Sequence, residues 1–110
     1  MKIFLDTAEV TDIARRHHGL LSGVTTNPTL IAKAGRNPND VYKEIIDLGI
    51  KDLSIEVEGE YFDELLANGL NTANKFGERV TIKLPCTPDG LKACKYLTSQ
   101  VIRVNMTLVF

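Results

Sequence analysis

The hexapeptide VTIKLP (residues 80–85) is the most informative segment of this chain for predicting its fold. Its β-branched and aliphatic residues predict a buried strand, and Pro85 ends that strand. Side chains alternate along a strand, so Thr81 and Lys83 share one face while three aliphatic residues, Val80, Ile82 and Leu84, occupy the other. The sequence therefore places a lysine at the end of a buried strand.

Lys83 has two interpretations at this position. Desolvation disfavours the charged form of an amine, which raises the neutral fraction that can attack a carbonyl. Lys83 is then a nucleophile that forms a Schiff base. Alternatively it makes a structural ion pair with Glu56 or Asp6, because ion-pair networks also occur inside proteins. The strand by itself leaves both alternatives open.

Outward from this strand, short β-rich runs alternate with longer stretches of helical period, which is typical of successive βα units. The predicted strands are Ile3–Asp6, Ser22–Thr26, Leu53–Val57, Val80–Leu84 and Ile102–Phe110. The predicted helices are Glu9–His18, Asp40–Leu48, Phe62–Phe76 and Gly90–Ser99. This order implies parallel strands with right-handed crossovers, either in an open doubly wound sheet or in part of a (β/α)8 barrel.

Helix boundary signals agree with these assignments. Thr7, Asn37-Pro38 and Thr87-Pro88 can cap or start helices, and glycines at positions 19, 49 and 77 follow three helical stretches. At the end of the second strand, Pro28 is expected to fix a turn that leads into Leu30, Ile31 and Ala32.

Three predicted strands end with a charge on the less apolar face: Asp6, Glu56 and Lys83. Helices cover both faces of a doubly wound sheet, so charges there would be costly. The C-terminal mouth of a barrel collects such groups into one site. We therefore predict an α/β fold in which the chain forms roughly the first five strands of a (β/α)8 TIM barrel.

Further polar side chains follow two other strands. Thr26 and Asn27 end the second strand, where the Asn27 amide could hold a substrate hydroxyl. Thr107 lies in the fifth strand, where its hydroxyl could orient a catalytic water.

Composition excludes several classes of partner. The 110 residues are 44% hydrophobic and 25% charged, as in an ordinary globular domain, and the net charge is -1. Without a basic surplus we expect no nucleic-acid partner and no membrane association. The N-terminus meets Asp6 after three apolar residues, so we expect a cytoplasmic location. Cys86 and Cys94 lack a nearby histidine, which predicts reduced thiols and no metal site.

Four motifs, all at strand ends and in chain order, carry a resemblance. They are FLDTA (residues 4–8), GVTTNP (23–28), IKLP (82–85) and NMTLVF (105–110). Together they resemble the small transaldolase family, which includes the fructose-6-phosphate aldolases. The resemblance implies a class I aldolase mechanism on sugar phosphate substrates, with no cofactor.

The resemblance also implies residue roles. Lys83 would attack the ketone carbon of a ketose phosphate and form an imine. Asp6 would take the proton from the C4 hydroxyl as the C3–C4 bond breaks, leaving a dihydroxyacetone enamine on the lysine.

Other matching positions complete the implied site. Glu56 would shuttle protons through a water ordered by Thr107, and Asn27, with Thr26 beside it, would bind the three-carbon unit. A glutamate at position 56 resembles the transaldolases, whereas the fructose-6-phosphate aldolases tend to carry glutamine. The resemblance thus favours transfer of the dihydroxyacetone unit to an aldose phosphate, as in the pentose phosphate pathway.

Length departs from the family pattern. A (β/α)8 barrel usually needs about 250 residues, so residues 1–110 are expected to be the N-terminal part of a single barrel domain, without strands six to eight. The family's phosphate-binding arginine would be among the missing residues. Open strand edges would favour a homo-oligomer or association with a complementary barrel half.

Three alternatives stay open at this point. The chain could be a fructose-6-phosphate aldolase, which is a lyase rather than a transferase. It could be a catalytically inactive, truncated half-barrel that acts as an assembly module. It could also be a separate small α/β domain that binds phosphate ligands at helix N-termini.

Overall fold

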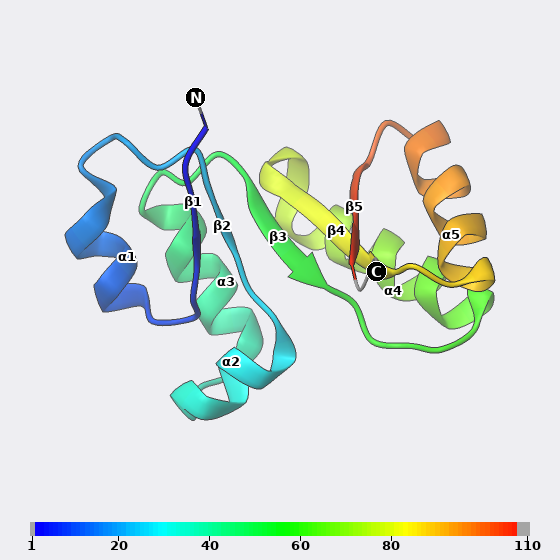
Figure 1. Cartoon of the computed structure of the whole chain (residues 1–110), viewed down its shortest axis with the longest axis horizontal. Helices are drawn as coiled ribbons and strands as arrows, with labels where there is room; N and C mark the ends of the chain where they lie inside the picture. The colour runs from blue at the N-terminus through cyan, green and yellow to red at the C-terminus, as the bar shows by residue number, and fades with distance from the viewer. Residues whose placement is uncertain (1, 108–110) are drawn as a thin grey trace. The chain divides into compact units, whose positions relative to one another are not determined.

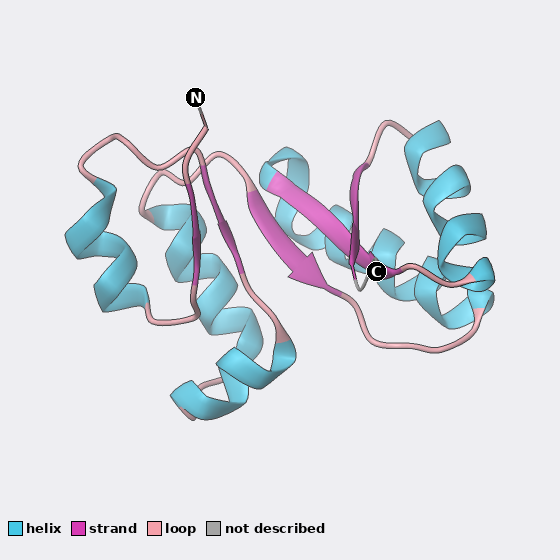
Figure 2. Ribbon diagram, in the orientation of Figure 1, coloured by secondary structure: helices cyan, strands magenta, loops and turns pink. Residues whose placement is uncertain are grey.

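The computed structural model describes residues 2–107 of the chain. Five parallel strands alternate with helices, so the fold belongs to the α/β class as predicted (Figure 2). The chain divides into two compact units, residues 1–54 and 55–110, and each is described here by itself. The prediction of one continuous barrel domain over residues 1–110 stays a prediction.

The first unit contains three strands and three helices (Figure 1). In chain order these are β1 (Phe4–Asp6), α1 (Val10–His17), β2 (Gly23–Thr25), α2 (Pro28–Ala34), α3 (Pro38–Asp47) and the start of β3 (Leu53–Glu56). β2 is the central strand, paired in parallel with β1 on one side and β3 on the other. The core of the first unit consists of fully buried side chains: Ile13, Val24, Val41, Ile45, Ile50 and Leu53.

Local chemistry explains the starts of α2 and α3. The Asn27 side chain accepts a hydrogen bond from the Leu30 N–H at 2.9 Å, and Asn37 accepts one from the Asn39 N–H at 2.9 Å. A proline follows each asparagine, where its fixed φ suits the first helical position and no N–H is needed.

The expectation of a turn after the second strand was wrong, because Pro28–Ala34 is helix α2. An Asn-Pro pair is a turn signal and also a helix-start signal. With seven residues, α2 is too short to show a clear helical period in the sequence.

The second unit contains the end of β3, two α-helices and two further strands. They are α4 (Phe62–Phe76), the short 3₁₀ helix η1 (Gly77–Arg79), β4 (Val80–Pro85), α5 (Pro88–Ser99) and β5 (Arg103–Thr107). α4 and α5 pack against each other and against β4, and β4 pairs in parallel with β5. Fully buried Leu65, Ile82, Leu84, Ala93 and Leu97 form the core of this unit.

The turn from β4 into α5 requires glycine at position 90. A Cβ at this position would collide with the Pro85 carbonyl oxygen, so the backbone comes closer than any side chain permits. The Thr87 hydroxyl accepts a hydrogen bond from the Gly90 N–H at 3.0 Å and caps the helix as predicted.

Most predicted boundaries are confirmed to within two or three residues. The Thr7 hydroxyl accepts from the Glu9 N–H at 3.1 Å, but the residue at the N-cap of α1 is Glu9. Glycines 19, 49 and 77 adopt the positive φ expected beyond helix ends. The predicted continuation of the fifth strand through residues 108–110 lies outside the described residues.

Candidate functional site

Lys83 lies near the C-terminal end of β4, with a half-buried side chain between two fully buried neighbours in the chain. Across the β4–β5 pair, its Cα partner is Asn105. On the other side, the Lys83 carbonyl accepts a hydrogen bond from the Val57 N–H at 3.3 Å. In a parallel ladder this bond brings Glu56, the residue before Val57, alongside Lys83.

Glu56 and Thr107 flank this position on the two neighbouring strands. Glu56 is the last residue of β3 and Thr107 the last of β5, and both side chains are half-buried. Thr107 pairs with Pro85, and its carbonyl accepts a hydrogen bond from the Cys86 N–H at 3.0 Å. The second unit therefore brings Glu56, Lys83 and Thr107 to the C-terminal ends of adjacent strands.

In the first unit, Asp6 ends β1 and lies across from Thr25 on β2. The Thr25 hydroxyl donates a hydrogen bond to Asp6 Oδ1 at 2.9 Å. Thr25 was not among the predicted site residues. Its position at the end of the second strand could be inferred from the sequence. Its pairing with Asp6 could not, because that pairing depends on the register between β1 and β2.

Thr26 and Asn27 directly follow β2, and both side chains hydrogen-bond within the fold. Thr26 is fully buried and its hydroxyl donates to the Ser54 carbonyl at 3.0 Å. Asn27 is half-buried and its Oδ1 caps α2. Substrate contact by either residue stays a prediction. For Asn27 that contact would have to use the NH₂ group, because the side-chain oxygen already caps α2.

Arg36 and Glu44 make a bidentate ion pair, with N–O distances of 2.7 and 2.6 Å. Their mutual hydrogen bonds, with charge attraction added, raise the pKa of Arg36 and lower the pKa of Glu44. Arg36 precedes α3 and Glu44 lies within it, so the pair fixes the connection between α2 and α3.

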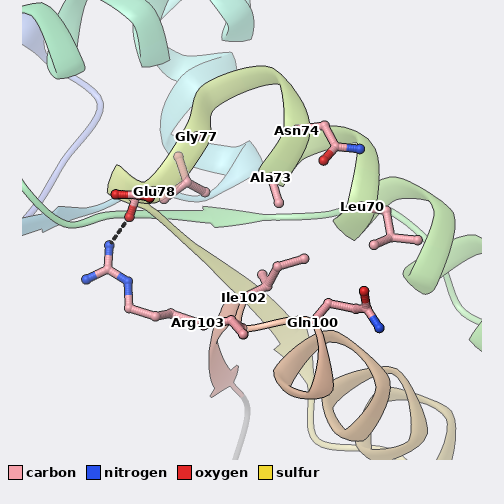
Figure 3. A pocket seen from close by; sticks show the side chains of 10 residues that line it. Leu70, Ala73, Asn74, Gly77, Glu78, Gln100, Ile102 and Arg103 are labelled. Carbon is pink, nitrogen blue, oxygen red and sulfur yellow. Dashed lines mark hydrogen bonds between the residues drawn. The ribbon is translucent and has the colours of Figure 1, made fainter.

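The second unit also has a cavity of about 620 Å³ at the opposite ends of its strands (Figure 3). Its lining residues are Leu70, Ala73, Asn74, Gly77, Glu78, Val80, Gln100, Val101, Ile102 and Arg103. Val80 and Arg103 are the first residues of β4 and β5, and the Arg103 guanidinium donates to the Glu78 carbonyl at 2.8 Å. None of the predicted site residues lines this cavity.

Cys86 and Cys94 are free thiols, as predicted. Among residues 2–107, no group of three or more His, Cys, Asp or Glu side chains is arranged to hold a metal ion. Over the same residues, no helix is both long and apolar enough to cross a membrane.

Comparison with known proteins identifies the family. The family described as transaldolase/fructose-6-phosphate aldolase matches residues 3–110. Probable transaldolases from Nitrosopumilus maritimus, Anaeromyxobacter sp. and Hyphomonas neptunium are 47%, 48% and 50% identical to the chain, over its whole length. The chain covers 50% of the first relative and 51% of each of the other two.

The chain thus spans about half the length of the curated relatives that it matches, and its five parallel strands are consistent with an incomplete TIM barrel. The match over residues 3–110 includes all four strand-end motifs found in the sequence. The chain therefore belongs to the transaldolase/fructose-6-phosphate aldolase family.

Proposed function

We propose that this chain carries the Schiff-base site of a transaldolase, which transfers a dihydroxyacetone unit from fructose 6-phosphate or sedoheptulose 7-phosphate to an aldose phosphate. One observation carries the proposal: half-buried Lys83 lies alongside Glu56 on β3 and opposite Asn105 on β5. The ends of three adjacent strands thus carry an amine, the Glu56 carboxylate and the Thr107 hydroxyl, which are the groups that imine formation and its proton transfers need.

Imine formation is the first half of the reaction. The Lys83 amine adds to the C2 carbonyl of the ketose phosphate and gives a carbinolamine. Glu56 takes the proton that the lysine ammonium loses on becoming the free amine, and then delivers it, through a water bound by Thr107, to the departing hydroxyl, which leaves as water. The protonated imine withdraws electrons from C3 and so needs no separate cofactor.

Carbon–carbon bond cleavage is the second half. Asp6 takes the proton from the C4 hydroxyl, and the C4 oxygen forms a carbonyl as the C3–C4 bond breaks. The electron pair of that bond becomes the C2=C3 bond of an enamine, and the imine π pair moves to the nitrogen. Asn27 and Thr26 hold the three-carbon unit until it attacks the acceptor aldose phosphate.

Glu56 favours transfer over simple cleavage. A glutamate at this position resembles the transaldolases, whereas the fructose-6-phosphate aldolases tend to carry glutamine, so we assign the site to transfer, as in the pentose phosphate pathway. If the residue instead supports rapid hydrolysis, the enzyme is a fructose-6-phosphate aldolase. Comparing transfer to erythrose 4-phosphate with release of free dihydroxyacetone separates the two activities.

The working protein needs the rest of the barrel under this proposal. We propose that a homo-oligomer or a complementary barrel half supplies it, because the relatives are about twice as long as this chain. Ile3 and Phe4, which are 46% and 41% exposed, are apolar groups that such a partner could cover. The cytoplasmic location expected from the sequence stays a prediction.

Borohydride trapping tests the function. The chain is incubated with dihydroxyacetone or fructose 6-phosphate and reduced, both alone and with the part of the Nitrosopumilus relative that it does not cover. Peptide mass spectrometry should find a three-carbon adduct on Lys83. Lys83→Met should abolish the adduct, while Lys92→Met, at an exposed position on α5, should retain it. Absence of any adduct in both preparations would refute the proposal.

A further inference from the structure

Asp6 has one well-defined side-chain partner, the Thr25 hydroxyl at 2.9 Å from Oδ1. An ionised carboxylate can only accept hydrogen bonds, so the Thr25 O–H must donate in this pair. Within residues 2–107, neither carboxylate oxygen of Asp6 makes any other hydrogen bond. The two oxygens of Asp6 are therefore not equivalent.

Thr25 is the more firmly held member of the pair. It lies on the central strand of the first unit, with Asp6 as its Cα partner on one side and Ser54 on the other. Its carbonyl accepts a hydrogen bond from the Thr7 N–H at 3.0 Å. The residues before and after it, Val24 and Thr26, are fully buried.

Asp6 is less constrained. It is exposed and ends a three-residue strand which, among the described residues, pairs with β2 alone. An exposed carboxylate rotates about two side-chain bonds unless a partner selects one orientation. The hydrogen bond from Thr25, which β2 holds in place, therefore selects one orientation of the Asp6 side chain.

We propose that Thr25 is a positioning residue for the aldol step. By donating to Oδ1, it holds the carboxylate in one orientation and leaves Oδ2 as the oxygen that takes the proton of the C4 hydroxyl. The C4–O bond becomes a carbonyl, the C3–C4 electron pair forms the enamine double bond, and the imine pair moves to the Lys83 nitrogen. This role rests on the proposed function and deepens it, because it concerns the same step.

The alternative is an ordinary cross-strand pair that only stabilises the sheet, as Thr and carboxylate side chains do elsewhere. The two roles differ in what they affect. Removing a pair that only stabilises the sheet lowers the stability of the first unit without slowing one particular step of the reaction. Removing a positioning residue slows the carbon–carbon bond cleavage that uses Asp6 and leaves imine formation unchanged.

Thr25→Val and Thr25→Ser separate these roles. Valine keeps the β-branched shape and removes the hydroxyl, and serine keeps the hydroxyl and removes the methyl group. The first readout is borohydride trapping with dihydroxyacetone, which forms the imine and breaks no carbon–carbon bond. The second is single-turnover release of glyceraldehyde 3-phosphate from fructose 6-phosphate, in the same preparation.

We expect Thr25→Val to trap dihydroxyacetone like the original chain and to cleave fructose 6-phosphate about 10- to 100-fold more slowly, because a misplaced catalytic group typically costs that much. Thr25→Ser should cleave within about 3-fold of the original rate. In an Asp6→Asn background, Thr25→Val should cause no further loss, because both changes then affect the same proton transfer.

Each contrary result has a separate meaning. Normal cleavage by Thr25→Val, or equal loss in Thr25→Ser, would overturn the positioning role while the trapping result left the proposed function intact. Failure of the original chain to trap dihydroxyacetone would overturn the proposed function and this role with it. Thermal unfolding of each variant checks that loss of cleavage does not follow loss of the folded state.

Discussion

Lys83 on β4 and Asn105 on β5 are Cα partners in a parallel strand pair. Neighbouring strands lie about 4.8 Å apart, and partner residues project from the same face of the sheet. On the β5 side, the group beside the proposed nucleophile is therefore a neutral amide, whereas Glu56 lies alongside it on the β3 side. A second carboxylate, at position 105, would further favour the ammonium form that cannot attack a carbonyl.

Asn105→Asp is predicted to slow imine formation on Lys83. A negative charge within reach of the amine favours its protonated form, and we expect trapping with dihydroxyacetone at neutral pH to fall about 10-fold. The measurement is the rate of adduct accumulation by mass spectrometry. Asn105→Ala, which stays neutral, should trap faster than Asn105→Asp. Equal rates for the two variants would contradict an electrostatic effect.

Val101→Gly is predicted to stabilise the second unit. Val101 has φ 62° and is 93% exposed, so a β-branched residue adopts the left-handed conformation with almost no packing to compensate. Relief of this strain, offset in part by the flexibility of glycine in the unfolded chain, should add about 0.5–1 kcal/mol to the free energy of unfolding.

Urea denaturation measures the effect of the Val101 substitutions. Val101→Ala is the matched control, because alanine keeps the Cβ that causes the strain and should give a smaller gain. The explanation fails if alanine stabilises as much as glycine, since loss of an exposed apolar side chain would then account for both results.

Arg36→Gln is predicted to change how stability depends on pH. Arg36 lowers the pKa of Glu44, chiefly through their hydrogen bonds, so folding favours the ionised carboxylate. The pair's contribution is fully present above the pKa that Glu44 has in the unfolded chain. It is lost as pH falls through the lower pKa of the folded state. Both side chains are largely solvated, so the effect is small.

The melting temperatures of the original chain and Arg36→Gln should therefore differ at neutral pH and converge in acid. NMR titration of the Glu44 carboxyl should show a higher midpoint in the variant. Lys33→Gln removes an exposed cation from α2 and serves as the control, with an unchanged Glu44 midpoint. A difference in melting temperature that persists in acid would point to lost packing instead of the ion pair.

Much of the fold could be predicted because its signals are local. Alternating apolar residues identified β4 and placed Lys83 near its end, and capping residues such as Asn37 and Thr87 identified helix starts. Helix α2 was missed because Asn27-Pro28 favours a turn and a helix alike, and the segment that follows is too short to show a period.

Less of the candidate site could be predicted, because its contacts join residues far apart in the sequence. The motif that contains Thr25 and Thr26 was found, but their separate environments were not. Thr25 hydrogen-bonds to Asp6, nineteen positions away, and Thr26 to Ser54, twenty-eight positions away. The cavity at the starts of β4 and β5 had no signal in the sequence, since its lining comes from four different elements and their connections.

The parallel βα units and the position of Lys83 at a strand end could be predicted from the sequence, because side-chain alternation and helix capping depend only on near neighbours. Which side chains meet depends on the tertiary structure. Strand register places Asn105 opposite Lys83 and Thr25 opposite Asp6. Register is fixed by hydrogen bonds and core packing between distant segments, and no local pattern in the sequence specifies those contacts.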